Sequence, residues 1–176
     1  MQFYKDGFRG GCPDIKEAAP NRRNRGTNEP LPEKVDVLIE GTGPAGLCLA
    51  AQLSQFPEID TMIIERMPSN IIKGKADGIN TRTMEMFQAF GFADKVKRET
   101  YWVNQTAFWM PDPQNPQHIK RVGRVQDVAD DSSEMPHILI NQARLHELFI
   151  EFMKNSPSRL EPDYGWEVVE IGRAHV

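Results

Sequence analysis

The sequence predicts an α/β fold built on a parallel sheet. Three observations predict this class: an apolar run at 35–39, a glycine-rich segment at 41–46, and a second apolar run at 59–65 that ends in an acid. A strand, a tight turn, a helix and a second strand in this order form a βαβ unit, whose strands lie parallel in one sheet. We expect strands at 35–39 and 59–65, with the intervening helix at 44–55.

The glycine-rich segment, Gly41-Thr42-Gly43-Pro44-Ala45-Gly46, has the GxGxxG spacing of dinucleotide-binding turns. In this pattern Gly41 permits the tight turn, Gly43 lets the backbone approach a pyrophosphate, and Gly46 allows close packing of the helix on the strand. The helix N-terminus offers N–H groups and a positive dipole end to phosphates. The spacing alone is weak evidence, but the strand before it and the acid after it strengthen it. We predict that the cofactor is bound by Gly41, Gly43, Ala45 and Gly46.

Glu65 ends the second apolar run, 19 residues after Gly46. A carboxylate at this place can accept hydrogen bonds from both ribose hydroxyls of an adenosine, and it repels a phosphate on that ribose. Arg66 follows directly, and we expect it near the adenosine end of the cofactor. The βαβ unit fits FAD and NAD equally well.

Composition limits the classes of protein further. The chain has 176 residues, of which 39% are hydrophobic and 26% charged, and its net charge is −4. This composition fits a globular domain and gives no indication of a nucleic-acid partner. No apolar run is long enough for a membrane span or a secretory signal. Because Cys12 and Cys48 do not make a disulfide framework, we expect a cytoplasmic protein. No metal site is expected, and residues 1–34 are predicted to form an irregular N-terminal arm.

The segments after Glu65 mix helices and strands. We expect a helix over 80–90 that stops at Gly91, a strand over 101–110, a partner strand over 119–128, and a helix that begins near Asn141. The last helix has apolar residues at the spacing of a buried stripe, namely Leu145, Leu148, Phe149, Phe152 and Met153.

Two further segments join the glycine turn and Glu65-Arg66 in a resemblance to a known family. They are Lys73–Glu85, which contains Ala76-Asp77-Gly78, and Pro136–His146, which contains Asn-Gln-Ala-Arg. With them, almost the whole chain resembles the phenol hydroxylase branch of the single-component, FAD-dependent aromatic hydroxylases. The resemblance implies that residues 35–170 form a truncated, Rossmann-like FAD-binding domain of the glutathione-reductase-like type. It also implies that the chain contains part of a β-rich region that is inserted into this domain and contributes to substrate binding.

The family resemblance implies a monooxygenase. In that family NADPH or NADH reduces FAD, and a flavin hydroperoxide formed with O2 transfers one oxygen to a phenolic substrate such as phenol or hydroxybenzoate. A base near the phenolic hydroxyl makes the ring electron-rich. The full-length protein is expected to be a homodimer. Two other classes stay open: a non-catalytic module that uses the nucleotide-binding fold to bind partners, and an NAD-dependent dehydrogenase.

The resemblance also implies roles for four side chains, each with a structural alternative. Asp77 matches the active-site aspartate and is the candidate base; it could instead form a turn. Arg82 matches an arginine that binds pyrophosphate oxygens, or it is a surface residue of a helix. Gln142 matches a residue that contacts the ribityl chain or phosphate, or it is a capping side chain. His137 resembles a substrate-pocket histidine, or it is a structural histidine.

Two residues depart from the family pattern, namely Glu40 and Lys75, which replaces the glutamine common before Ala-Asp-Gly. Glu40 stands where the family has a small or apolar residue, and a carboxylate there would be costly to bury and would repel a pyrophosphate. Residues 171–176 are identical to one translation of a sequencing-library adapter, and we expect them not to be native. The third parallel strand of the sheet and a Gly-Asp flavin motif are then expected beyond this end. We expect the 176 residues alone to bind flavin weakly and to be inactive.

Overall fold

The structure is a computed structural model that describes residues 11–12, 14–22 and 30–172. The remaining parts of the predicted arm, and residues 173–176 of the predicted adapter segment, lie outside the described residues. The chain divides into two compact units. The first consists of Met1–Ile72 and His146–Val176, and the second of Lys73–Leu145.

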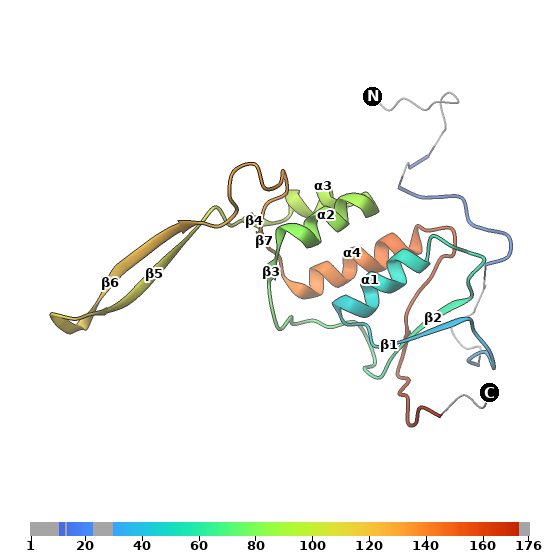
Figure 1. Ribbon diagram of the computed structural model, residues 1–176. Helices are drawn as coiled ribbons and strands as arrows, with labels where there is room; N and C mark the ends of the chain where they lie inside the picture. Colours follow the sequence, from blue (N-terminus) through green and yellow to red (C-terminus); the bar gives the residue numbers. More distant parts are fainter. Residues whose placement is uncertain (1–10, 13, 23–29, 173–176) are drawn as a thin grey trace. The chain divides into compact units, whose positions relative to one another are not determined.

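The first unit is built on a parallel sheet with the strand order β1-β2-β8 (Figure 1). β1 covers Val37–Glu40, β2 covers Thr61–Glu65, and β8 covers Asp163–Tyr164. Val37 of β1 lies opposite Thr61 of β2, and Ile64 of β2 lies opposite Asp163 of β8. The α/β class and the βαβ unit expected from the sequence are confirmed.

A third parallel strand is present within the chain, so the expectation that it lies beyond residue 170 is wrong. β8 is only two residues long, and no apolar run marks it in the sequence. The segment after it stays against β2 and the residues that follow, because Trp166 N donates to Glu65 O at 3.0 Å and Gly165 N donates to Met67 O at 3.0 Å. The backbone around Glu65 is therefore bordered on both sides by other strands.

Helix α1 (Pro44–Leu53) joins β1 to β2 and packs on both strands. Pro44 stands in its first turn, where the missing N–H costs no hydrogen bond. The side chains of β1 alternate between its two faces: Val37 and Ile39 lie on one face, where Ile39 is buried, and Leu38 lies exposed on the other. The buried apolar core of this unit comprises Ile39, Leu47, Ala50, Ala51, Met62, Ile63, Ile64, Leu148, Phe149 and Met153.

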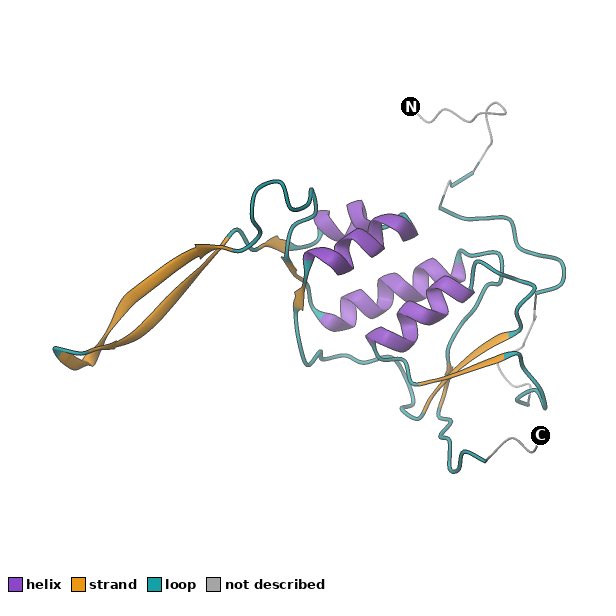
Figure 2. Cartoon of the chain, in the orientation of Figure 1, coloured by secondary structure: helices purple, strands orange, loops and turns teal. Residues whose placement is uncertain are grey.

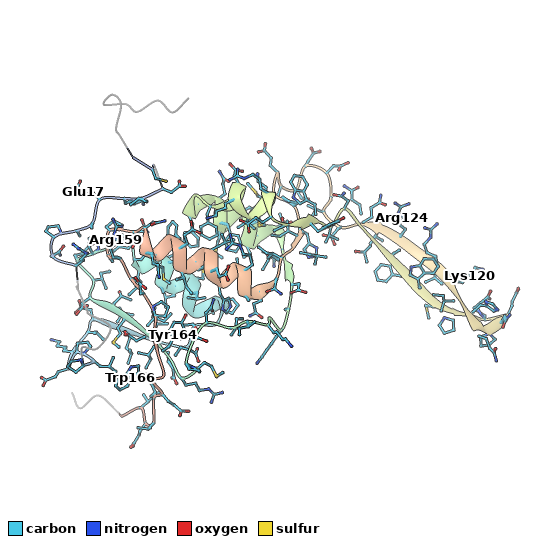
Figure 3. The ribbon with its side chains drawn as sticks, turned by 180° about the vertical axis from the view of Figure 1, so that it is seen from behind. Glu17, Lys120, Arg124, Arg159, Tyr164 and Trp166 are labelled. Atoms are coloured by element: carbon cyan, nitrogen blue, oxygen red, sulfur yellow. The ribbon has the colours of Figure 1, made fainter. Side chains whose placement is uncertain are left out.

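Part of the predicted N-terminal arm lies against the turn that follows α4 (Gln142–Lys154). Lys16 N donates to Asn155 O at 2.9 Å, and Ala19 N donates to Pro157 O at 3.0 Å. Arg159 Nη2 in turn donates to Lys16 O at 2.7 Å. Figure 3 shows Arg159 in this region. Residues 14–22 form no helix or strand, yet their backbone is fastened to the first unit.

The second unit contains helices α2 (Thr81–Phe90) and α3 (Ala93–Arg98). The Asn80 side chain caps α2 by accepting a hydrogen bond from Thr83 N at 2.9 Å, and Gly91 ends the helix with a φ of 88°. Helix 80–90 is therefore confirmed, whereas α3 was not expected. The buried apolar core of this unit comprises Met84, Phe87, Phe92, Ala93, Val96, Ile138, Ile140, Ala143 and Leu145.

A small antiparallel sheet in the second unit has the order β3-β7-β4, formed by Gly78–Ile79, Ile138–Leu139 and Tyr101–Trp102. Strand 101–110 was expected to be continuous, but it is two strands in different sheets. The second of these, β5 (Gln105–Asp112), pairs only with β6 (Asn115–Gln126). The chain changes sheets at Val103 and Asn104.

Strands β5 and β6 form a long two-stranded antiparallel ribbon, which Figure 2 shows in orange. The pairing of these two segments is as expected, although β5 continues to Asp112, beyond the expected end at residue 110. Most of the ribbon's side chains are exposed, among them Lys120 and Arg124 of β6 (Figure 3).

The Asn141 side chain caps α4, since its Oδ1 accepts a hydrogen bond from Ala143 N at 2.9 Å. The expected apolar stripe is buried except for Phe152, which is half-buried. Among the described residues, no helix combines the length and apolar character needed to span a bilayer. Cys12 and Cys48 are both free thiols, and burial raises the pKa of Cys48.

Candidate functional site

The glycine turn between β1 and α1 disfavours side chains at two of its positions, Gly41 because of its backbone conformation and Gly46 because of a close contact. Gly41 has a φ of +93°, which favours glycine. A Cβ on Gly46 would lie 2.1 Å from the Gly41 carbonyl oxygen and 3.5 Å from Ile39 Cγ2. At Gly43, by contrast, a Cβ would meet no described atom within 4 Å. The turn is thus tight on its inner side and open where Gly43 begins the helix.

The N-terminus of α1 is open to an anion. The residue at the N-cap is Gly43, and among the described residues no side chain caps this helix. Gly43 and Ala45 are exposed. N–H groups of a first helical turn that lack protein partners favour a phosphate oxygen, as does the helix dipole.

Glu65 lies beside this turn and is held by Thr42. Its Oε2 accepts hydrogen bonds from Thr42 N at 2.8 Å and Thr42 Oγ1 at 3.1 Å, and its Oε1 accepts one from Met67 N at 3.0 Å. Partial burial raises the pKa of Glu65, but these hydrogen bonds and the Arg66 charge together outweigh that effect and leave the pKa lower than usual. Glu65 is therefore an ionised acceptor. Thr42, which is buried, was not singled out from the sequence.

Glu65 has two neighbours of interest: Tyr164, its partner across the sheet, and Arg66, which follows it in the sequence. Tyr164 of β8, which Figure 3 labels, pairs with Glu65 in the register of the sheet. Burial raises the pKa of Tyr164, and the charges of Glu65 and Glu161 raise it further. Arg66 points its guanidinium toward Glu167, with Nη1 3.8 Å from Oε1, and both side chains are largely exposed. The structure thus brings together the glycine turn and Glu65, while the Arg66 side chain lies exposed and points toward Glu167.

Glu40 occupies the end of β1, directly before the glycine turn. Its side chain is exposed, so the expected cost of burying a carboxylate does not arise. Its charge nevertheless stands next to the turn, because Gly41 follows it and Gly41 N donates to Ile64 O at 2.8 Å.

In the second unit, Gln142 fastens the segment that contains Asp77. Gln142 Oε1 accepts a hydrogen bond from Lys75 N at 2.7 Å. A Cβ on Gly74 would lie 2.5 Å from Gln142 Cβ, so the two backbones approach too closely for any other residue at 74. Asp77 O accepts a hydrogen bond from Ile140 N at 2.8 Å, and the Asp77 side chain is exposed. Gly74 was not singled out from the sequence.

Arg82 lies in the first turn of α2 with its side chain 86% exposed. Its Nη1 donates to Glu85 Oε2 at 2.7 Å. Glu85 is held in turn by Ser133, whose Oγ donates to Glu85 Oε1 at 2.8 Å. Arg82 is therefore accessible to a ligand and anchored at one nitrogen.

His137 directly precedes β7, and its imidazole contacts a carboxylate. Its Nδ1 lies 2.7 Å from Asp127 Oδ2. Its Nε2 lies 3.4 Å from the place where a Cβ on Gly78 would be. Asp127 was not among the candidate site residues.

Comparison with known proteins decides the family. Residues 34–169 match the family model described as FAD binding domain. The chain belongs to this FAD-binding family. It is 51% identical over 175 residues to 3-hydroxybenzoate 4-monooxygenase of Comamonas testosteroni, a match that covers 99% of this chain and 27% of that enzyme. It is 35% identical over 142 residues to the FAD-dependent monooxygenase terD of Aspergillus terreus, over 80% of this chain and 23% of that protein.

A solved structure shows the same fold. The p-nitrophenol 4-monooxygenase PnpA of Pseudomonas putida superposes with a TM-score of 0.68 at 18% identity, over 80% of this chain and 34% of that chain. The FAD-binding chain spans about a quarter of the length of the curated relatives named above.

The first unit fits the family's cofactor. The open side of Gly43 and the exposed first turn of α1 leave the backbone accessible to a pyrophosphate. Glu65 is fixed and ionised where a ribose would need an acceptor. These residues therefore form a site whose donors match phosphate and whose acceptor matches ribose.

Proposed function

We propose that the chain is the N-terminal part of a flavoprotein monooxygenase that hydroxylates a phenolic substrate, phenol or hydroxybenzoate, with O2 and NADPH or NADH. The observation that carries this proposal is the 51% identity to 3-hydroxybenzoate 4-monooxygenase over almost the whole chain. That enzyme's name gives 3-hydroxybenzoate as the first probe.

In this function the first unit holds the adenosine half of FAD. Gly41, Gly43, Ala45 and Gly46 form the turn and helix start that face the pyrophosphate, and Glu65 accepts from the ribose hydroxyls. Arg66 lies at the adenosine end. Arg82 and Gln142 contact the cofactor's phosphate or ribityl groups, which the exposure of Arg82 supports. When bound, FAD supplies the redox chemistry and the activation of O2.

Asp77 takes up the proton of the phenolic hydroxyl, which makes the ring more electron-rich. Its backbone is fixed by the hydrogen bond from Ile140 N, while its side chain is exposed and free to meet a ligand. His137 contacts the substrate from the same small sheet, in which β3 pairs with β7. The proposal gives Asp77 the chemical role and His137 a binding role.

The proposal also covers the division of the chain into segments and the assembly of the full-length protein. Residues 35–170 form part of the FAD-binding domain, residues 1–34 form an arm, and residues 171–176 are translated adapter sequence. The full-length protein is a cytoplasmic homodimer.

The test is to read the source gene past the codon for Val169 and to express the full-length protein. We expect a yellow protein that oxidises NADPH or NADH faster with 3-hydroxybenzoate or phenol, and a product that carries one oxygen atom from labelled O2. A stop codon directly after Val176 in the gene contradicts the N-terminal-part proposal. A full-length protein that binds no flavin and hydroxylates none of the phenols supports the non-catalytic module instead.

Asp77→Asn tests the base. We expect it to lower hydroxylation on the order of 10²-fold, the usual contribution of a general base, with FAD content unchanged. Asp94→Asn is the matched control, because Asp94 is exposed on α3 and paired with Lys97. Equal hydroxylation by Asp77→Asn and the unsubstituted protein excludes Asp77 as the base.

A further inference from the structure

The second unit contains a carboxylate–imidazole pair formed by Asp127 and His137. The proposed function gives His137 a contact with the substrate but gives Asp127 no role. The two residues are ten apart in sequence, and His137 Nδ1 lies 2.7 Å from Asp127 Oδ2. Asp127 directly follows β6 and His137 directly precedes β7. The loop between them brings the two side chains together.

The backbone fixes both partners of this pair. Asp127 N donates to Asn104 O at 3.0 Å, and Val103 N donates to His137 O at 2.9 Å. Val103 and Asn104 are neighbours in the short connection between β4 and β5. The backbones of Asp127 and His137 are both hydrogen-bonded to the β4–β5 connection. The distance between the two residues is therefore set by the main chain.

The contact also determines which ring nitrogen of His137 is available. An ionised carboxylate only accepts hydrogen bonds, so Nδ1 carries the proton that Asp127 binds. The side chains of His137 and Asp127 are only 30% and 19% exposed, which shields the contact from water. Nε2 is left on the side of Gly78, where the missing side chain leaves room, one residue after Asp77.

We propose that Asp127 is a positioning residue that fixes the His137 imidazole, so that its Nε2 meets an oxygen of the phenolic substrate. The inference rests on the proposed function, which gives His137 its contact with the substrate. Asp127 itself does not touch the substrate. Without its carboxylate the ring can rotate, and the neutral imidazole can carry its proton on either nitrogen, so substrate binding weakens while the chemical step is preserved.

The experiment uses the full-length protein with FAD bound and 3-hydroxybenzoate as the probe. Its dissociation constant is measured by calorimetry on the oxidised protein, and KM and kcat by turnover. Asp127→Asn keeps the shape but weakens a charge-assisted hydrogen bond, and Asp127→Ala removes it. We expect the dissociation constant and KM to rise about threefold for Asp127→Asn and about tenfold for Asp127→Ala, with kcat changed less than about twofold.

A double-mutant cycle with His137→Gln separates positioning from an independent effect. If Asp127 acts through His137, Asp127→Ala changes the dissociation constant by less than about twofold in the His137→Gln background. FAD content and thermal unfolding of each variant identify damage to the fold.

The role of Asp127 is refuted, while the proposed function stands, if Asp127→Ala leaves the dissociation constant unchanged and His137→Gln raises it. The role is also refuted if the double variant raises the dissociation constant by the product of the two single-variant effects. It is also overturned if Asp127→Ala only lowers the unfolding temperature. A failure of the unsubstituted protein to bind and hydroxylate either 3-hydroxybenzoate or phenol refutes the proposed function, and the inference with it.

Discussion

Thr42 donates two hydrogen bonds to one carboxylate oxygen of Glu65, from its backbone amide at 2.8 Å and from its hydroxyl at 3.1 Å. The residue between the first two glycines of the turn thus holds the acid that ends the second strand, 23 positions later. The glycine turn and the Glu65 carboxylate are therefore held together by direct hydrogen bonds.

Replacing Thr42 with valine keeps the shape of the buried side chain and removes the hydroxyl. A hydrogen bond to a charged group contributes about 1.5–3 kcal/mol at most, and Glu65 keeps its two backbone donors. We expect Thr42→Val to weaken FAD binding by the full-length protein about fivefold, measured by flavin fluorescence titration. Thr42→Ser keeps the hydroxyl and is the matched control. Equal FAD affinities of the Thr42→Val and Thr42→Ser variants would show that the hydrogen bond from the Thr42 hydroxyl to Glu65 does not contribute to FAD binding.

The features that could be predicted from the sequence are those with local causes. The Gly41–Gly46 turn follows from the spacing of glycines, and α2 follows from Asn80 as its cap and Gly91 as its stop. β8 could not be predicted, because two residues carry no periodicity and their pairing with β2 depends on contacts about 100 residues apart in sequence.

Site residues that depend on distant contacts were missed for the same reason. In the sequence nothing distinguishes Gly74 from other loop glycines, and only the structure shows that it packs closely against Gln142. Asp127 reads as a residue at the end of a strand until the loop brings His137 to it. The cofactor and substrate roles of Asp77, His137, Arg82 and Gln142 stay predictions, since the structure shows their positions and not their ligands.

Glu40 is expected to weaken FAD binding through its charge. The side chain is exposed and directly precedes the glycine turn, so replacing it costs no buried contact. We expect Glu40→Val to tighten FAD binding about fivefold at low salt, since a like charge near a surface contributes roughly 1 kcal/mol. Glu40→Gln is the control that separates charge from side-chain shape and should reproduce most of the gain.

Salt dependence checks the electrostatic origin of the Glu40 effect. Screening between exposed charges is nearly complete at 1 M salt, so the difference between Glu40→Val and the unsubstituted protein should shrink there. Unchanged affinity of both variants at low salt contradicts the prediction.

His146 is expected to make stability depend on pH. Its imidazole is 1% exposed, and its Nε2 has no hydrogen-bond partner among the described residues. Burial lowers the pKa of His146, although the Glu65 charge opposes this effect. As the pH falls below about 6.5, the unfolded chain binds a proton that the folded chain does not, so the free energy of unfolding decreases.

Urea unfolding at pH 7.5 and 5.5 measures the contribution of His146. We expect His146→Gln to reduce the loss of stability between these two pH values, because the variant has no group to protonate. His118→Gln removes an exposed histidine of β6 and should leave the loss unchanged. An identical loss in His146→Gln and the unsubstituted protein would mean that other groups cause the acid sensitivity.

Gly74 is expected to be intolerant of any side chain. A Cβ there would lie 2.5 Å from Gln142 Cβ and 3.1 Å from Gln142 N, and a helix backbone cannot move aside as a flexible side chain can. Overpacking of this kind costs about 1–3 kcal/mol. We expect Gly74→Ala to lower the free energy of unfolding by that amount and to weaken FAD binding as well, because the shift displaces the Gln142 side chain. Gly123→Ala is the matched control, since its Cβ would lie 3.6 Å from the Phe108 ring. A Gly74→Ala protein as stable as Gly123→Ala would show that the Lys73–Asp77 segment can move away from α4 at little cost.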